Sequence, residues 1–349
     1  MTCGGYTFGV IPFGYAPMEM RSVADIPEGP HWQYEPKWDG FRCLAFRDGS
    51  EVALQSKAGM PLGRYFPEIV AAIGLVRCER FVLDGELVVP LEGALSFDAL
   101  QQRIHPAASR VAMLATTMPA WLLAFDLLSE NGIDLVEIPL AERRARLEAF
   151  AARFAVGPLR LSPATRDRGA VDAWFARVGG ALDGVIAKRL DLPYASGKRD
   201  AAVKVKRERT ADCVVGGFRY AKGSTSRVGS LLLGLYDDAG LLDHVGFCSA
   251  FPVAERERLL TRLRPHEGEP GFTGSAPDAA PSRWSRGEDR DRTYVKLRGD
   301  LVLEVAFDQV TGGRIRHGTR PVRWRPDKSP RQCTFEQLET PNRILALLE

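Results

Sequence analysis

The sequence predicts two domains of different fold class, a mixed α/β domain over residues 1–208 and a small all-β domain over residues 209–349. The chain has 349 residues, which is too long for one ordinary domain and suits two. Its hydrophobic content of 45% and charged content of 26% are those of a globular protein with a real core. Near residue 210 the pattern changes from strands mixed with helices to short strands separated by turns that contain Gly or Asp.

In the first domain, runs rich in Val, Leu and Phe predict strands. These runs lie at 41–47, 51–55, 81–89, 121–128 and 184–189. Leu140, Leu147 and Phe150 stand among Arg and Glu residues, and this spacing predicts an amphipathic helix over 137–155. Asp172 precedes a helix-compatible run and has the character of an N-cap, so we expect a short helix to begin there.

In the second domain, short β-prone runs and one helix predict a small closed barrel of the OB-fold kind. The runs lie at 212–220, 230–236, 241–248, 293–297 and 301–307, and the helix at 253–263. Residues 265–292 are rich in Pro, Gly, Ser and charge, so we expect them to form an exposed connection within this domain.

Composition argues against several classes of protein. No apolar run reaches the ~20 residues that cross a bilayer, so no membrane association is expected. The N-terminus has no basic segment followed by an apolar one, so it is not a secretory signal. The six cysteines stand singly without a Cys-x-x-Cys pair, which argues against a zinc site and favours reduced thiols in the cytoplasm.

The distribution of charge is more informative than the net charge of +3. Residues 314–331 carry seven Arg or Lys residues against one acid, Asp327, and a second basic group lies at 204–209. Such clusters are typical of surfaces that bind phosphate. A solvated face or a set of salt-bridge partners would give the same runs, so charge alone leaves nucleic acid as one open possibility.

Lys37 lies in the run Glu-Pro-Lys-Trp-Asp-Gly-Phe-Arg at 35–42. By itself this pattern also fits an ordinary surface lysine. A lysine amine attacks the α-phosphorus of a nucleotide only when unprotonated, so a nucleophilic Lys37 would need cationic neighbours that lower its pKa. The phosphates would need Arg, Lys and a divalent metal to neutralise them. Such a lysine therefore predicts carboxylates and further cations from distant parts of the chain.

Segments with these properties follow Lys37 in order. They are the Leu-Asp-Gly-Glu-Leu run at 83–87, the apolar run at 121–128 with Phe125, the run at 182–188 with Asp183 and Lys188, the alternating Val-Lys-Val-Lys at 203–206, and Arg-Trp-Arg-Pro-Asp-Lys at 323–328. Because strand side chains alternate, Lys204 and Lys206 are expected on one face.

This series resembles the nucleotidyltransferase motifs I, Ia, III, IIIa, IV, V and VI shared by ATP-dependent DNA ligases, RNA ligases and mRNA-capping enzymes. It covers nearly the whole chain, and it is most similar to the short bacterial ATP-dependent DNA ligases of the LigC type and to the ligase module of LigD. The resemblance implies an α/β (α+β) adenylyltransferase domain of the ATP-grasp-like DNA ligase fold at 1–208, followed by an OB-fold domain at 209–349. It also implies an enzyme that seals 3′-OH/5′-phosphate nicks in DNA through a lysyl-AMP intermediate.

The resemblance implies a role for individual positions. Lys37 would carry AMP. The residues that would bind the nucleotide are Glu35 at the adenine amino group, Trp38, Arg42 at the ribose and phosphates, Glu86 at the ribose, Phe125 against the adenine ring, Lys188, Lys204 and Lys206 at the α-phosphate, and Arg325, with Asp327 and Lys328, at the pyrophosphate during enzyme adenylation only. Asp183, with Glu86, would hold Mg²⁺ or Mn²⁺. Ser56, Lys57 and Arg64 would contact DNA.

Simpler interpretations stay open for several of these residues. Phe125 fits a plain core position, and Glu86 and Asp183 fit ion-pair partners within a sheet. Lys57 and Arg64, in a Gly-rich loop, fit solvated side chains. Asp84 fits a turn or structural carboxylate better than a catalytic one.

Two positions depart from the family pattern. Asp183 stands where motif IV usually has Glu, and Val203 stands where motif V often has an aromatic residue. Neither change removes a charge, and Asp still offers hard oxygen ligands for a divalent metal.

Two other functions compete with the DNA ligase hypothesis. One is an RNA ligase or capping-type nucleotidyltransferase of the same superfamily. The other is a non-catalytic OB-fold protein that binds nucleic acid, because such barrels bind single strands through basic grooves. The intact set of motif residues argues against the second. For a ligase we expect a cytoplasmic monomer, associated with the nucleoid through nicked duplex DNA and acting in repair alongside a repair polymerase.

Overall fold

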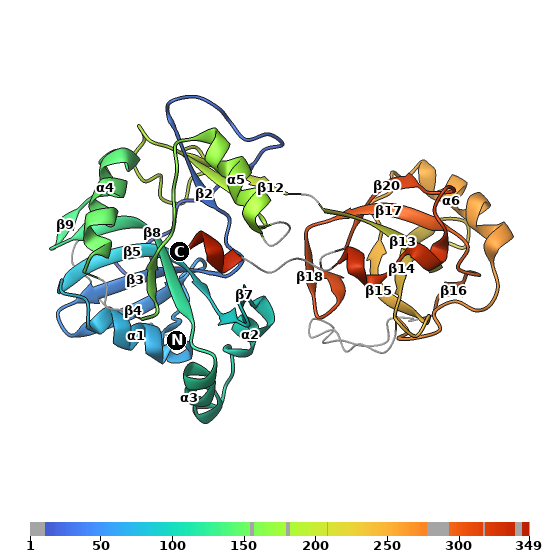
Figure 1. The fold of residues 1–349 in the computed structure, drawn as a ribbon, viewed down its shortest axis with the longest axis horizontal. Helices are drawn as coiled ribbons and strands as arrows, with labels where there is room; N and C mark the ends of the chain where they lie inside the picture. Colours follow the sequence, from blue (N-terminus) through green and yellow to red (C-terminus); the bar gives the residue numbers. More distant parts are fainter. Residues whose placement is uncertain are drawn as a thin grey trace. The chain divides into compact units, whose positions relative to one another are not determined.

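The computed structural model describes residues 11–153, 157–178, 182–207, 209–277, 293–316, 318–338 and 344–348. The chain divides into two compact units (Figure 1). The first consists of Met1–Arg207 together with Thr340–Glu349, and the second of Glu208–Glu339.

Two main sheets form the first unit. One has the strand order β1-β12-β11-β2, and the other has the order β10-β8-β5-β3-β4 with β9 paired to β8. The strands of this unit are β1 (Arg21–Ser22), β2 (Trp32–Pro36), β3 (Phe41–Asp48), β4 (Glu51–Ser56), β5 (Arg80–Val88), β6 (Pro90–Leu91), β7 (Ala94–Leu95), β8 (Trp121–Glu130), β9 (Ile133–Asp134), β10 (Leu159–Leu161), β11 (Gly184–Arg189) and β12 (Ala202–Lys206). Its helices are α1 (Pro67–Gly74), α2 (Phe97–Gln102), α3 (Ala108–Thr117), α4 (Leu140–Ala151) and α5 (Arg168–Val178), with 3₁₀ turns η1 (Gly63–Tyr65) and η6 (Ile344–Leu347).

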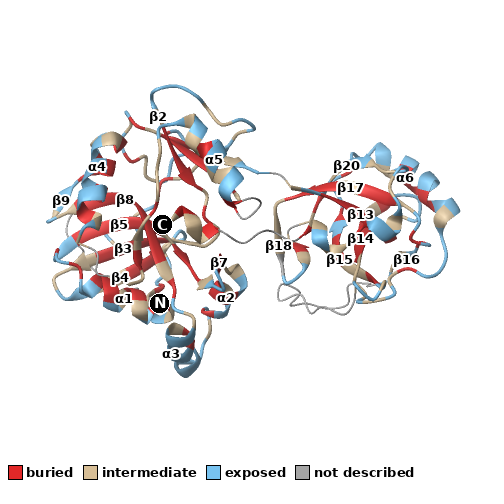
Figure 2. Cartoon of the chain, viewed as in Figure 1, coloured by how far each residue is buried: buried red, intermediate tan, exposed pale blue. Residues whose placement is uncertain are grey.

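The sheet that contains β3 is buried on both faces, as Figure 2 shows for the centre of this unit. Strand side chains alternate, so Cys43 and Ala45 pack on one face with residues of α1 and α4. Leu44 and Phe46 pack on the other face with Ala202 of β12. The second face is therefore the one turned toward the smaller sheet.

The second unit is a β-rich domain. Its main sheet follows the path β15-β14-β13-β17-β20, with β16 paired to β13, and β18 pairs with β19. A parallel bridge between Cys248, at the end of β15, and Thr319, just before β20, joins the two edges of the path as in a closed barrel. The elements are β13 (Arg209–Tyr220), β14 (Val228–Tyr236), β15 (Leu242–Cys248), α6 (Glu255–Leu263), η3 (Arg264–His266), β16 (Val295–Lys296), β17 (Val302–Phe307), β18 (Gln309–Thr311), β19 (Arg314–Arg316), β20 (Arg320–Trp324), η4 (Pro330–Gln332) and η5 (Phe335–Gln337).

Two expectations about helices need adjustment. Asp172 is not an N-cap but lies inside α5, where it pairs with Arg168 at 2.7 Å. The side chain of Asp167 accepts a hydrogen bond from the backbone N–H of Gly169 at 2.8 Å, which is the kind of bond that starts a helix. The helix expected over 137–155 begins at Leu140 and ends at Ala151, and residues 154–155 lie outside the described residues.

The last part of the chain belongs to the first unit, whereas the sequence placed all of 209–349 in the second domain. Ile344 and Leu347 are buried in an apolar cluster with Trp38, Val88 and Leu123. In Figure 1 the C-terminal label accordingly lies on the first unit. We call residues 344–348 the tail.

Within the described residues, no helix has the length and apolar character needed to cross a membrane. The five cysteines in the described part of the chain are free and buried. Residues 1–10, which include Cys3 and the segment expected not to be a secretory signal, lie outside the described residues. Much of the expected connection at 265–292 also lies outside them.

Candidate active site

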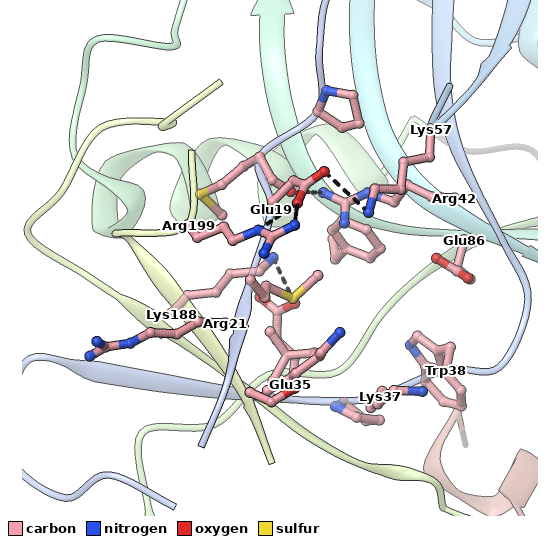
Figure 3. Close-up of a pocket in the computed structure, with 18 residues that line it drawn as sticks. Glu19, Arg21, Glu35, Lys37, Trp38, Arg42, Lys57, Glu86, Lys188 and Arg199 are labelled. Carbon is pink, nitrogen blue, oxygen red and sulfur yellow. Dashed lines mark hydrogen bonds and ion pairs between the residues drawn. The ribbon is translucent and has the colours of Figure 1, made fainter. Parts of the chain in front are cut away.

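A cavity of about 380 Å³ is lined by residues from both sheets of the first unit (Figure 3). Residues 17–22, which precede β2 and which we call the strap, form one wall. The sequence-predicted residues that line the cavity are Glu35, Lys37, Trp38, Arg42, Lys57, Glu86, Phe125, Lys188 and Lys204. The cavity thus brings together residues from most of the motifs in this unit.

Lys37 follows β2 directly and lies beside the start of β11. Its backbone N–H donates to the carbonyl oxygen of Gly184 at 3.0 Å. Its Nζ donates to Oδ2 of Asp183 at 2.8 Å, and both side chains are about one-fifth exposed, at 19% and 20%. The candidate nucleophile and the candidate metal carboxylate are therefore in direct contact.

The electrostatic setting of Lys37 differs from the expectation that cations lower its pKa. Burial lowers the pKa of the amine, but the carboxylates of Asp183, Asp39 and Glu86 outweigh burial and raise it. The nearest charge is negative, because Asp183 forms an ion pair with the amine. Without a nucleotide, Lys37 is therefore held protonated.

Glu35 and Lys188 form a buried ion pair between neighbouring strands β2 and β11. Lys188 Nζ lies 2.8 Å from Glu35 Oε2, and the two side chains are 4% and 3% exposed. Gln33 Nε2 donates to the other carboxylate oxygen at 2.9 Å. Lys188 Nζ also lies 4.4 Å from the centre of the Phe125 ring, so a cation and an aromatic face meet at this wall.

Arg42 is fixed by Asp84, a fully buried carboxylate on the adjacent strand β5. Its Nε and Nη2 donate to the two oxygens of Asp84 at 2.5 Å each, which is a bidentate pair. The guanidinium lies 4.7 Å from the centre of the Phe125 ring. Asp84 thus has the structural role that its sequence setting favoured, and it acts on a cavity residue.

Glu86 follows Asp84 on the same face of β5 and lines the cavity. Burial raises the pKa of its carboxyl to about 7, although Arg42 and Lys37 act in the opposite direction. A carboxyl with this pKa exchanges its proton near neutral pH, which suits a group that meets a charged ligand.

Cations gather on the side of the cavity away from Lys37. In Figure 3, Glu19 of the strap lies there between Lys57 and Arg199. Its carboxylate is 3.3 Å from Lys57 Nζ and 2.7 Å from Arg199 Nη2. Burial lowers the pKa of Lys204, and the charges of Lys206 and Lys37 add to that effect.

Several predicted residues do not line the cavity. The hydroxyl of Ser56 accepts from the backbone of Met60 at 3.0 Å, so it stabilises a turn. Arg64 donates to the carbonyl oxygen of Pro106 at 3.0 Å. Lys206 follows Lys204 on β12 with its side chain exposed. Trp38, by contrast, does line the cavity, and its indole N–H (Nε1) also donates to the hydroxyl of Ser162 at 2.9 Å.

Arg325 and Lys328 lie in the second unit, just after β20. Arg325 Nη1 donates to both oxygens of Asp212 on β13 at 2.9 and 3.0 Å, and its Nη2 donates to Asp327 at 2.9 Å. Lys328 Nζ lies 3.6 Å from the same Asp212. One carboxylate therefore holds Arg325 and Lys328, the two cations assigned to the pyrophosphate, side by side.

The comparisons with known proteins give one family. Residues 18–206 match the family model described as ATP dependent DNA ligase domain, and residues 224–328 match the ATP dependent DNA ligase C terminal region. DNA ligase C2 of Mycolicibacterium smegmatis is 48% identical over 93% of this chain and 94% of its own length. The chain belongs to the ATP-dependent DNA ligase family. Membership implies ATP as a substrate, a divalent metal and DNA as the polymer, and it confirms the resemblance read from the motifs.

Further relatives of this ligase are similar over less of their own length or in fold alone. The multifunctional non-homologous end joining protein LigD of Pseudomonas aeruginosa is 32% identical over 91% of this chain but only 36% of its own length. A solved structure from a study of Lig E DNA ligases has a TM-score of 0.53 at 17% identity, over 89% of this chain and 99% of that chain. The expected fold class, an adenylyltransferase domain followed by a β-rich domain, is confirmed.

Sequence reasoning did not select several residues that shape this ligase's cavity. The alternation of side chains in the Leu-Asp-Gly-Glu run places Asp84 on the same face as Glu86, so its position near the cavity could have been predicted. The strap and Arg199 carried no signal, because their place in the cavity depends on pairing with distant parts of the chain. One such pairing is that of Arg21 in β1 with Val203 in β12.

Proposed function

We propose that this ligase seals 3′-OH/5′-phosphate nicks in duplex DNA, and that Lys37 carries AMP between ATP and the 5′-phosphate. The observation that supports this most directly is the position of the Lys37 amine, in contact with Asp183 at the wall of a cavity that also holds Lys188, Lys204 and Arg42. An amine, a carboxylate and several cations in one cavity are what transfer of a charged phosphoryl group requires.

Within this proposal, the described contacts suggest what each group does. The ion pair with Asp183 holds the Lys37 amine in place, and adenylation requires the amine to leave this pair and lose its proton. Phe125 offers a ring face to the adenine, and Glu35 offers carboxylate oxygens to its amino group. Arg42 and Glu86 meet the ribose, and Trp38 stabilises the wall beside the amine. Lys188, Lys204 and Lys206 act on the α-phosphate.

The remaining predicted residues are assigned to the pyrophosphate and to DNA. Arg325 and Lys328 of the second unit orient the pyrophosphate during enzyme adenylation. Ser56, Lys57 and Arg64 contact the DNA backbone. The exposure of Lys57, at 62% of its side chain, supports a role that depends on a solvent-accessible cation.

The carboxylates near Lys37 fit a hard divalent cation, and we propose Mg²⁺ or Mn²⁺ held by Asp183 and Glu86. In the described residues no group of three or more His, Cys, Asp and Glu side chains could by itself hold a metal ion. Mg²⁺ is commonly held by one or two carboxylates together with the substrate phosphates, and Asp183 and Glu86 would be those carboxylates. The metal would supply positive charge beside the phosphates during transfer.

We further propose a role in DNA repair for a cytoplasmic monomer that associates with the nucleoid through nicked DNA and works beside a repair polymerase. The similarity to the end-joining protein LigD supports repair as the setting. The division of the chain into domains at 1–208 and 209–349 is also part of the proposal. It is changed in one respect, because the tail at 344–348 is assigned to the first domain.

The test is incubation with α-labelled ATP and Mg²⁺, followed by denaturing electrophoresis. The wild-type chain should acquire a labelled band, and Lys37→Ala should not. Lys222→Ala, which removes an exposed lysine of the second unit, is the control and should label like wild type. A band that survives Lys37→Ala would contradict the proposal. Comparing the sealing of nicked DNA with that of nicked RNA then measures how far this DNA ligase tolerates RNA strands.

A further inference from the structure

Tyr194 lies behind the cavity wall, in the segment between β11 and β12. Its side chain is 4% exposed and packs in the apolar cluster between the two sheets. Its ring stacks on that of Tyr15, with centroids 6.3 Å apart and an interplanar angle of 26°. Tyr194 is not among the residues that line the cavity, so it would contact no nucleotide there.

The hydroxyl of Tyr194 joins two segments that do shape the cavity. The backbone N–H of Met18, in the strap, donates to Tyr194 Oη at 2.9 Å. Tyr194 Oη lies 2.6 Å from Oδ2 of Asp84. A backbone N–H can only donate, so the hydroxyl accepts from Met18 and its own proton points at the carboxylate. The direction of both hydrogen bonds is therefore fixed.

Asp84, which accepts the hydrogen bond from Tyr194, also holds Arg42. The same carboxylate takes two hydrogen bonds from the guanidinium, which leaves Nη1 as the nitrogen without a bond to Asp84. Arg42 Nη2 also approaches the carbonyl oxygen of Met18 at 3.5 Å. Met18, Tyr194, Asp84 and Arg42 thus form a closed ring of contacts. Met18 belongs to this ring through both of its backbone polar groups. Its N–H bonds to Tyr194, and its carbonyl oxygen contacts Arg42.

We propose that Tyr194 is a positioning residue for the nucleotide, whose hydroxyl holds the strap and the Arg42 guanidinium in a fixed arrangement against each other at the cavity wall. This inference rests on the proposed function, because it takes the cavity to be the ATP site. Removing the hydroxyl leaves the Met18 N–H without its acceptor and Asp84 with one donor fewer. The strap and Arg42 then move independently, and the cavity must be ordered again whenever ATP binds.

The first experiment compares two buried tyrosines. In nick sealing with excess nicked DNA, which regenerates the Lys37 amine, Tyr194→Phe is expected to raise the KM for ATP about ten-fold. It should change kcat by less than about two-fold, because the contact that is lost orders the binding site. Tyr34→Phe is the matched control. Tyr34 is 1% exposed, and its hydroxyl donates to the carbonyl oxygen of Pro27 at 2.8 Å, away from the cavity.

Urea unfolding of both variants separates binding from stability. A purely structural role would lower stability in both variants and leave both KM values at that of wild type. A KM for Tyr194→Phe no higher than that of Tyr34→Phe would overturn the inference. Lys37→Ala is run in parallel: labelling that persists in it contradicts the proposed function, whereas Lys37-dependent labelling with an unchanged KM in Tyr194→Phe contradicts only the inference.

A double-mutant cycle with Arg42→Lys tests whether Tyr194 acts through Arg42. Lysine cannot form the bidentate pair with Asp84, so the ring of contacts is already open in this variant. Adding Tyr194→Phe should then raise the KM by less than about two-fold more. Independent effects, in which the two fold-changes multiply, would show that Tyr194 does not act through Arg42 and would overturn the inference.

Discussion

At the scale of single residues, His244 in the second unit shows how burial sets a charge state. Arg314 Nη2 lies 2.6 Å from His244 Nδ1. A guanidinium can only donate, so Nδ1 accepts and the ring is neutral. Burial, followed by the charges of Arg314 and Arg219, lowers the pKa of His244 to about 4.

This lowered pKa predicts a pH-dependent stability. The unfolded chain protonates His244 near pH ~6.5 and the folded chain only near pH 4, so stability present at pH 7 is lost as the pH falls from ~6.5 to 4. The loss amounts to up to about 3 kcal/mol. His244→Asn keeps an acceptor for Arg314 but does not titrate, so its free energy of unfolding should decline less over this range. Urea unfolding at pH 7 and pH 4.5 measures the difference, and equal declines in both proteins would contradict the prediction.

Much of the cavity was predictable from the order of motif residues, because each motif carries its own charge or aromatic ring. Nine of the predicted residues line it. The charge state of Lys37 was not predictable, because it depends on which charge lies nearest in space. Asp183, far along the chain, is that charge, and the pairing of β11 with β2 brings it there.

At the scale of elements, β20 shows why charged strands escape prediction. Its sequence, Arg-Pro-Val-Arg-Trp, has no apolar alternation, and none of its residues is buried. The sequence instead placed a strand at 293–297, where only Val295–Lys296 form one. The other four β-prone runs of this unit overlap β13, β14, β15 and β17, with the runs at 241–248 and 301–307 each starting one residue early, and the inward residues of these strands form the core.

The end of β20 also yields a prediction about a single reaction step. Arg325→Ala should slow lysyl-AMP formation about 100-fold, because a cation that neutralises the leaving pyrophosphate is lost. Sealing of a nick that already carries AMP should change only a few-fold, since no pyrophosphate leaves in that step. Rapid-quench assays of the two reactions measure this split.

Arg323→Ala provides the matched control for that experiment. Arg323 lies on β20, two residues before Arg325, is 64% exposed and pairs with Glu304 at 2.6 Å. It should behave like wild type in both reactions. Equal losses of both reactions in Arg325→Ala would show that Arg325 has no special part in adenylation.

The tail predicts a stability effect in the first unit. Leu347 is 8% exposed and packs against the cluster around Trp38, so Leu347→Ala should lower the free energy of unfolding by about 2–4 kcal/mol. Leu345→Ala, at a partly buried position of the same tail, should cost less than about 1 kcal/mol. Urea unfolding followed by Trp fluorescence compares the two. A smaller effect at Leu347 than at Leu345 would contradict this packing.

At the scale of the whole molecule, DNA affinity should depend steeply on salt. The net charge is only +3, so binding must rest on local cations such as Lys57 and Arg199. If about six phosphates are contacted, affinity for nicked duplex DNA falls about 1000-fold between ~50 and ~200 mM salt. Lys57→Ala should reduce the slope of log K against log salt by about one. Fluorescence anisotropy across a salt series measures both slopes, and a shallow wild-type slope would refute phosphate-driven binding.

The two-domain plan was predictable from the change of pattern near residue 210, but the return of the tail was not. A short apolar run such as Ile-Leu-Ala-Leu-Leu at 344–348 fits the core of either domain. Its partners, among them Val88 and Leu123, are far from it in the chain. Only the fold decides between the two cores.

The tail has a consequence for how the protein is made. A ribosome synthesises Trp38 early and Leu347 only after every strand of the second unit. The apolar cluster beside Lys37 therefore stays open until the second unit has been translated, even though most of the first unit precedes it. A nascent chain that stalls within the second unit carries all the cavity-lining residues but lacks the packing that covers Trp38. Completion of the wall beside the candidate nucleophile thus waits for synthesis of the tail, which follows the second unit in the chain.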